Sequence, residues 1–326
     1  MITSLSPEAS VIGGEPTVFV GLVNGTLIAA DASNGTVRWS RNLNNAYTNA
    51  LYSNTVSADG RIVYVGTLDS TTYALFAVDA TTGIQKWNSS SSIDAGIGMS
   101  APAESPDGKT LFVGAQPSTN GPSLCAVNAA DGTLKWSFMT VGAINSSPVV
   151  SADGKTVFAG SEDGHLYTVD ADTGGQKWSF NTSAGVFGSP VLIMSPDGKT
   201  IFTGSSDTAL YALDAATGTE QWSVPTGAAI MASPVMSTDG NTVYVVSADG
   251  VLHAVDVQAP PPAPAAGGFV CVDDHCRPSN MTSVGIPQAW CESICGTAAL
   301  KYKCVNKRCI PDDGGIPYES CEGACL

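Results

Sequence analysis

One short pattern recurs five times along the chain, and each copy ends in a tryptophan. The copies read "AADASNGTVRW", "AVDATTGIQKW", "AVNAADGTLKW", "TVDADTGGQKW" and "ALDAATGTEQW". The steps from one tryptophan to the next are 48, 49, 42 and 44 residues. Self-similarity at a period of about 45 residues is the signature of a fold built from repeated units, so this repeat constrains the fold more than any other feature.

Each unit also contains short apolar runs separated by turn residues. The turns "SADGR", "SPDGK", "SADGK" and "STDGN" place Asp-Gly between apolar runs, which is a strong hairpin signal because Gly accepts a positive φ. In the fourth unit the runs are "SPVV", "TVFAG", "HLYTVD" and "QKWSF". Four short strands per unit predict one four-stranded antiparallel sheet per repeat. Because such a sheet has two faces to bury, we expect radial stacking in an all-β fold, a β-propeller.

The repeat predicts about six blades, of which the last is incomplete. The first blade needs an inner strand, which we expect within Thr3 to Val11. A sixth copy begins at "LHAVD", but the residues that follow, "QAPPPAPAAGG", cannot form an interior strand because proline removes the ladder donor. The third strand of the last blade therefore has an open edge, which we expect the N-terminal segment, the C-terminal module or a neighbouring chain to cover. This predicted assembly edge consists of Val251, Leu252, His253, Ala254, Val255, Asp256 and Val257.

The recurring motif has a structural explanation. Its Asp can accept hydrogen bonds from the following backbone, and Thr-Gly or Asp-Gly closes the turn. The tryptophan on the fourth strand then lies flat between its own blade and the next one, with a single N–H to satisfy. The predicted docking residues are Trp39, Trp87, Trp136, Trp178 and Trp222.

The pattern A-x-D-x-x-T-G-x-x-x-W, present in Ala77 to Trp87 and in Ala212 to Trp222, resembles the tryptophan-docking repeat of pyrroloquinoline-quinone-type propellers. The resemblance covers roughly residues 5 to 257. That superfamily includes quinone-dependent alcohol dehydrogenases and also cofactor-free propellers, such as the lipoprotein of the outer-membrane β-barrel assembly machinery. The resemblance implies that a quinone enzyme would need eight blades, a vicinal Cys-Cys disulfide, a calcium site and a catalytic Asp. With about six repeats and one propeller cysteine, Cys125, the chain is expected to have no catalytic site and no cofactor.

A second, cysteine-rich repeat follows the propeller. We predict a propeller at 1–257, a Pro/Ala/Gly linker at 258–268 and two modules at 269–296 and 297–326. In each module Cys-x4-Cys would flank a hairpin and Cys-x3-Cys would share one face of a short helix. Disulfides, whose pairing stays open, are favoured over zinc because the spacings fit zinc sites only in part. The cysteines are Cys271, Cys276, Cys291, Cys295, Cys304, Cys309, Cys321 and Cys325.

Other polar residues give weak signals. His165 and His253 are interpreted as strand residues, and His275 lies in a hairpin. The Asp pairs at 273–274 and 312–313 are explained by turn chemistry, with Ca²⁺ as the alternative. Cys125 is expected to be a buried free thiol. The candidate N-glycosylation sites are Asn24, Asn34, Asn88, Asn145, Asn181 and Asn280.

Charge and cysteine usage narrow the compartment and the partners. A net charge of -15 disfavours nucleic acid and anionic lipid, and no apolar run is long enough to span a membrane. The N-terminus "MITSLSPEAS" lacks the features of a signal peptide. Eight of nine cysteines follow residue 270, a density typical of an oxidising compartment, so we expect a mature or truncated secreted form.

Three functions are compatible with these features. The first is a non-catalytic extracellular scaffold that assembles with proteins, as a subunit of a surface oligomer or filament. The alternative is a secreted carbohydrate-binding protein that uses exposed aromatics such as Trp290, Tyr302 and Tyr318. A quinone-dependent dehydrogenase is a distant third.

Overall fold

The structure is a computed structural model, and it forms two compact units, Met1–Ala254 and Val255–Leu326. It describes residues 8–43, 50–68, 74–89, 96–97, 100–116, 123–184, 192–258, 269–272, 275–278, 301–305 and 308–315. All secondary-structure elements among these residues are β-strands. Within the same ranges there is no helix that could cross a membrane.

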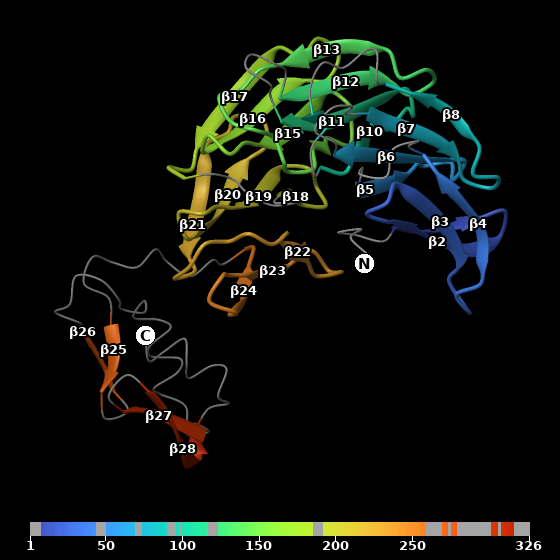
Figure 1. Cartoon of the computed structure of the whole chain (residues 1–326). Coiled ribbons are helices and arrows are strands. Elements are labelled where there is room, and N and C mark those ends of the chain that lie inside the picture. The colour runs from blue at the N-terminus through green and yellow to red at the C-terminus, as the bar shows by residue number, and fades with distance from the viewer. Residues whose placement is uncertain are drawn as a thin grey trace. The chain divides into compact units, whose positions relative to one another are not determined.

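Six antiparallel sheets follow one another along the first unit, and Figure 1 shows them as an arc of blades that runs from the blue first sheet to the orange sixth. The first three sheets contain β1 (Glu8–Ile12), β2 (Glu15–Gly21), β3 (Thr26–Asp31) and β4 (Val37–Asn42), then β5 (Ala50–Val56), β6 (Ile62–Leu68), β7 (Ala74–Asp79) and β8 (Gln85–Asn88), then β10 (Ala103–Glu104), β11 (Thr110–Gln116), β12 (Leu124–Asn128) and β13 (Leu134–Phe138), with β9 (Gly96–Ile97) on β11.

The last three sheets contain β14 (Val149–Val150), β15 (Thr156–Gly160), β16 (His165–Asp170) and β17 (Gln176–Asn181), then β18 (Leu192–Met194), β19 (Thr200–Gly204), β20 (Ala209–Asp214) and β21 (Glu220–Pro225), then β22 (Val235–Met236), β23 (Thr242–Val246) and β24 (Leu252–Asp256). The predicted β-propeller is confirmed. Among the described residues its sixth sheet has three strands, as the missing tryptophan strand predicts. The inner strand expected for the first blade is β1.

A row of three side chains crosses each complete blade. In the fourth blade Phe158 on β15 faces Thr168 on β16, which faces Trp178 on β17. The two rings approach to 6.0 Å between centroids, because the residue between them is small. The same aromatic–small–tryptophan row occurs in the other complete blades as Phe19–Ala29–Trp39, Tyr64–Ala77–Trp87, Phe112–Ala126–Trp136 and Phe202–Ala212–Trp222.

The tryptophan of one blade is received by a turn of the next blade. The indole N–H of Trp136 donates to the carbonyl oxygen of Ala171 over 2.9 Å. Gly174 lies against the same ring, and a Cβ there would stand 2.7 Å from ring atoms. The equivalent indole hydrogen bonds join Trp39 to Ala80, Trp87 to Ala129, and Trp178 to Ala215. The motif therefore acts twice, because its turn holds the preceding tryptophan and its own tryptophan docks on the following blade.

The aspartate of the motif shapes the receiving turn. Asp170 accepts hydrogen bonds from the backbone N–H of Thr173 and from the Thr173 hydroxyl, both at 3.0 Å. These bonds hold the pKa of the Asp170 carboxyl below its usual value. Asp79 and Asp214 accept the same pair of bonds from Thr82 and Thr217. The predicted role of this residue in the turn is thus seen in three blades.

The second unit contains two hairpins. They are β25 (Phe269–Val272) with β26 (His275–Pro278), and β27 (Lys301–Val305) with β28 (Arg308–Gly315). Cys271 faces Cys276 in the first, and Cys304 faces Cys309 in the second. The second cysteine pair of each module, with its expected helix, lies outside the described residues, so the bridging of these cysteines stays a prediction.

Replacing either of two buried threonines by valine should change the free energy of unfolding, in opposite directions. Thr168 is 0% exposed, and its hydroxyl has no hydrogen-bond partner among the described residues. The hydroxyl of Thr182, also 0% exposed, lies 2.9 and 2.7 Å from the carbonyl oxygens of Gly164 and Ala184. Thr168→Val should raise the free energy of unfolding by about 1 kcal/mol, and Thr182→Val should lower it by about 1 kcal/mol. Urea unfolding followed by tryptophan fluorescence measures both, and equal losses in the two variants would contradict this account.

Two glycines with the same backbone conformation separate the docking contact from backbone strain. Gly174 has φ +72° and lies against Trp136, whereas Gly35 has φ +76° and a Cβ there would meet nothing within 4 Å. Gly35→Ala should cost about 1 kcal/mol, the strain of a left-handed alanine. Gly174→Ala should cost about 3 kcal/mol, because overpacking against the ring adds to that strain. The difference in unfolding free energy is the test, and a difference near zero would rule out glycine's role in docking.

Candidate functional site

The last strand of the sixth blade, β24, has an outer edge that no described strand pairs with. Along the predicted assembly edge, Leu252, Ala254 and Asp256 are exposed, Val251, His253 and Val257 are half-buried, and Val255 is buried. The edge therefore alternates between the two faces of the sheet, as a strand with one covered face does.

One face of the sixth blade is apolar and uncovered. Tyr244 is 38% exposed, although the aromatic residue at this place in the five complete blades is at most 3% exposed. Leu252 is 64% exposed, whereas the matching leucine of the other third strands is 0% exposed in every case. The opposite face carries Val243, Val245 and Val255, which are all buried. We call the uncovered surface the blade-six face, made of Val235, Tyr244, Val246, Leu252 and Ala254.

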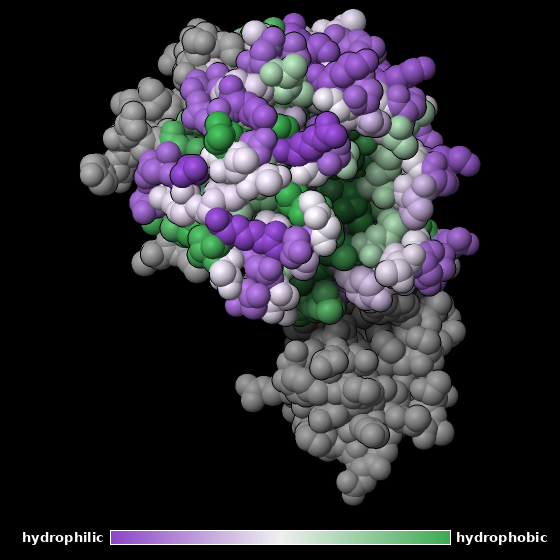
Figure 2. Space-filling model, turned by 90° about the vertical axis from the view of Figure 1, so that its right-hand side faces the viewer, coloured by the Kyte–Doolittle hydropathy of each residue, from purple (hydrophilic) through white to green (hydrophobic). Residues whose placement is uncertain are grey.

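The first blade has a tryptophan-receiving turn against which no tryptophan lies among the described residues. Its turn from Asp31 to Gly35 has the same hydrogen bond, from the N–H of Gly35 to the carbonyl oxygen of Asp31 at 2.8 Å, as the receiving turns of later blades. No repeat tryptophan precedes it in the chain, and Gly35 stands against open space. Nearby on the first blade, Val11 and Val37 are 65% and 55% exposed. In Figure 2 hydrophobic residues gather in a hollow on the side of the propeller that lies at the right of Figure 1.

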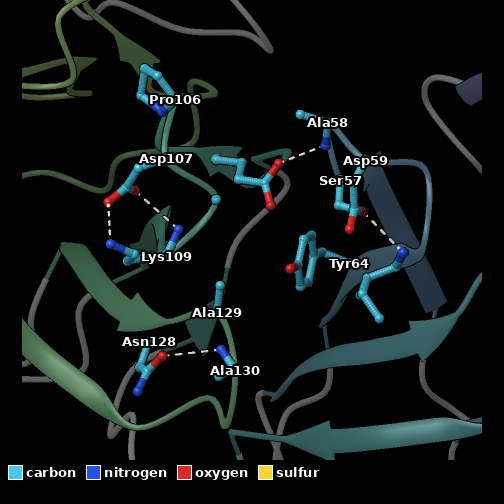
Figure 3. Close-up of a pocket in the computed structure, with 13 residues that line it drawn as sticks. Ser57, Ala58, Asp59, Tyr64, Pro106, Asp107, Lys109, Asn128, Ala129 and Ala130 are labelled. Carbon is cyan, nitrogen blue, oxygen red and sulfur yellow. Dashed lines mark hydrogen bonds and ion pairs between the residues drawn. The ribbon is translucent and has the colours of Figure 1, made fainter.

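A pocket of about 640 Å³ lies between the second and third blades (Figure 3). Its carboxylates are held by neighbouring donors. Glu104 accepts from the N–H of Ala58 at 2.7 Å, Asp59 accepts from the hydroxyl of Ser57 at 2.6 Å, and Asp107 accepts from the N–H of Lys109 at 3.1 Å. No histidine or cysteine lines the pocket. The contact between Ser57 and Asp59 recurs in the equivalent turns of the next two blades, as Ser105 with Asp107 and Ser151 with Asp153, so it belongs to the turn of the repeat.

Two of the residues at this pocket depart from the repeat together. Tyr64 stands where most blades have Phe, and Glu104 precedes the inner turn at a place that is Val150, Met194 or Met236 elsewhere. Burial raises the pKa of the Tyr64 phenol well above its usual value, and the negative charges of Glu104 and Asp59 add to the rise. The phenol therefore stays protonated in the interface between the two blades. Sequence analysis missed this pair, although both departures are visible when the repeats are aligned.

Two of the histidines lie beside polar side chains, and the propeller cysteine is buried. His165 lies 3.3 Å from the Asp163 carboxylate, and His253 lies 3.1 Å from the Ser247 hydroxyl. Burial lowers the pKa of His253. Cys125 is 0% exposed, and burial raises the pKa of its thiol to about 12, so it is protonated and packs as an apolar residue. The side chain of His275 and the aspartates at 273–274 and 312–313 lie outside the part of the structure whose side chains are described.

The candidate glycosylation sites differ in accessibility. Asn24, Asn34, Asn88 and Asn181 are exposed. Asn145 is 5% exposed, and its amide donates to the Glu162 carboxylate at 2.6 Å, so the folded blade does not present this side chain to solvent. Asn280 lies outside the described residues.

Comparison with known proteins supports the fold. A family model described as "Outer membrane protein assembly factor BamB" matches residues 3–137, 91–197 and 183–259. The sequence matches no curated protein. Among solved structures, BamB from Moraxella catarrhalis aligns with a TM-score of 0.58 and 21% identity, over 84% of this chain and 80% of that chain. The computationally designed Ika8 protein aligns with a TM-score of 0.59 and 17% identity, over 78% and 71% of the two chains.

The likeness to these structures concerns the fold alone. The family model, in contrast, covers all six blades, including the incomplete last one. The chain therefore belongs to the BamB-like family of pyrroloquinoline-quinone-type β-propeller repeat proteins.

Proposed function

We propose that this protein is a non-catalytic scaffold that assembles with other proteins through the open end of its sixth blade. The observation that carries the proposal is the apolar blade-six face, of which Leu252 is 64% exposed although its counterparts are fully buried. An apolar sheet face of this kind next to an unpaired strand edge is the usual site for addition of a partner. The family to which the chain belongs is described as an assembly factor, which supports the same role.

The chemistry of the propeller supports a role without catalysis. Cys125 is the only cysteine before residue 270, so the vicinal pair expected of a quinone enzyme is missing from the sequence. The carboxylates of the pocket between the second and third blades are engaged by nearby backbone and hydroxyl donors. We therefore propose binding rather than turnover, and expect neither quinone absorbance nor dye-linked alcohol oxidation in the purified protein.

The cysteine-rich tail supports an extracellular or cell-surface location. Eight cysteines in the last 56 residues are typical of small modules stapled by disulfides in an oxidising compartment. In that setting a propeller with one open end can act as a subunit of a surface oligomer or filament. A head-to-tail contact between subunits forms a ring if the rotation closes, and an open filament if it does not.

The assembly role predicts a dependence of native mass on the blade-six edge. Full-length protein isolated from its source should have a native mass above that of one chain, measured by light scattering after size exclusion. Leu252→Arg should reduce the mass to that of one chain, because a charge on the apolar face opposes burial. Val141→Arg is the matched control, since Val141 is 93% exposed on the loop after β13 and its replacement should change nothing. A protein that is monomeric and partner-free at all concentrations would overturn the proposal.

A further inference from the structure

The fourth strand of a complete blade covers two neighbours on the third strand. In the fourth blade Trp178 faces Thr168 and Phe180 faces Leu166. The third and fifth blades repeat this register with Trp136 and Phe138 over Ala126 and Leu124, and with Trp222 and Val224 over Ala212 and Leu210. In these three blades the outer strand carries tryptophan and, two residues later on the same face, a second apolar side chain, whereas Arg41 and Ser89 stand at the second place in the first two blades.

The sixth blade presents the matching residues without such a strand. Ala254 and Leu252 occupy the places of Ala212 and Leu210 in the repeat, and both are exposed. Tyr244 occupies the place of Phe202, which packs against Trp222 at 5.7 Å between ring centroids. The small side chain of Ala254 leaves room for an indole beside the Tyr244 ring, as alanine does in four of the five complete rows.

A single strand fits this site, but a further blade does not. Two residues after the aromatic residue on the second strand, every complete blade has glycine, and the following blade comes close to it. A Cβ at Gly21 would stand 2.7 Å from the Cβ of Leu51, and one at Gly204 would stand 2.8 Å from the Cβ of Ile230. The sixth blade has Val246 at this place, and it is 42% exposed. Its side chain excludes another sheet at the usual distance, including the first blade of a second copy, and leaves the place of the outer strand open.

The chain itself offers no second strand of this kind. Five of its six tryptophans already belong to complete blades. The sixth, Trp290, is followed two residues later by Glu292, so it lacks the second apolar side chain. These 326 residues thus hold no Trp-x-apolar segment outside the complete blades, and a partner protein is the source of the segment that we consider.

We infer that the sixth blade binds an extended segment of a partner protein with the pattern Trp-x-apolar, added antiparallel to β24. The indole covers Ala254 beside Tyr244, and the second apolar side chain covers Leu252. This inference rests on the proposed assembly function and specifies the chemistry of the partner. The added strand provides backbone hydrogen bonds along the edge, and the two side chains provide its specificity.

A synthetic peptide with the sequence of residues 174–182, "GGQKWSFNT", is a suitable probe because it contains β17 of the same protein. Binding of the fluorescently labelled peptide to the full-length chain is measured by anisotropy up to millimolar protein. We expect saturable binding that weakens at least tenfold when tryptophan in the peptide is replaced by alanine. Ala254→Arg in the protein should weaken binding by a similar factor, because the longer side chain occupies the place of the indole.

Two further protein variants locate the site. Val11→Arg, on the exposed side of β1, should leave binding unchanged, and Tyr244→Ser should weaken it without touching the strand edge. Binding that persists when the peptide tryptophan is replaced, or that survives Ala254→Arg, would overturn the inference, as would no binding at all. The native-mass experiment with Leu252→Arg is independent of the peptide. A positive result there with a negative peptide result would retain the assembly function and reject only the Trp-x-apolar partner.

Discussion

The propeller depends on one contact, in which the tryptophan of each of the first four blades lies between two sheets. Within its own blade the ring packs against an aromatic residue over a small one, as Trp136 does with Phe112 over Ala126. Towards the next blade the indole donates to Ala171 and lies under Gly174. The tryptophan stands on the outer strand, where Figure 1 shows β13 and β17 on the outside of the arc. A large side chain is suited to this place because radially arranged sheets diverge as they leave the axis.

Because the contact is directional, a chain of blades has two different ends. The second to fifth blades each receive a tryptophan at their turn from the preceding blade. The first blade has a receiving turn at Asp31 to Gly35, and no described residue lies within 4 Å of the place of a Cβ at Gly35. Among the described residues, no indole hydrogen bond joins Trp222 to the sixth blade, where Val257 and Gln258 follow β24 at the place of the receiving turn. Because each blade contacts only its neighbours, the two terminal blades each lack one of these contacts and expose the surface that would form it.

Much of this architecture could be predicted from the sequence, because the signals are local and repeated. The tryptophan spacing predicted the blades, Asp-Gly predicted the hairpins, and the prolines after Val257 predicted that the sixth sheet has three strands, as it has among the described residues. Features that depend on packing between blades were not predicted. Asn145 forms a sequon, yet it is buried because its amide reaches Glu162 on another strand's turn. The pairing of Tyr64 with Glu104 likewise requires two blades to be in register, which no single repeat reveals.

The residues of the blade-six face are those of a binding surface and differ from those expected of a terminal sheet that only faces water. A terminal sheet that had only to face water would carry polar residues at these positions, since exposed apolar groups on an edge invite aggregation. A sheet cut from the middle of a larger ring would retain glycine at position 246. The sixth blade does neither. It keeps Tyr244, Leu252 and Ala254 as the interior blades do, and it replaces the glycine by Val246. Such a face is suited to the addition of one strand, which is narrower than a whole blade.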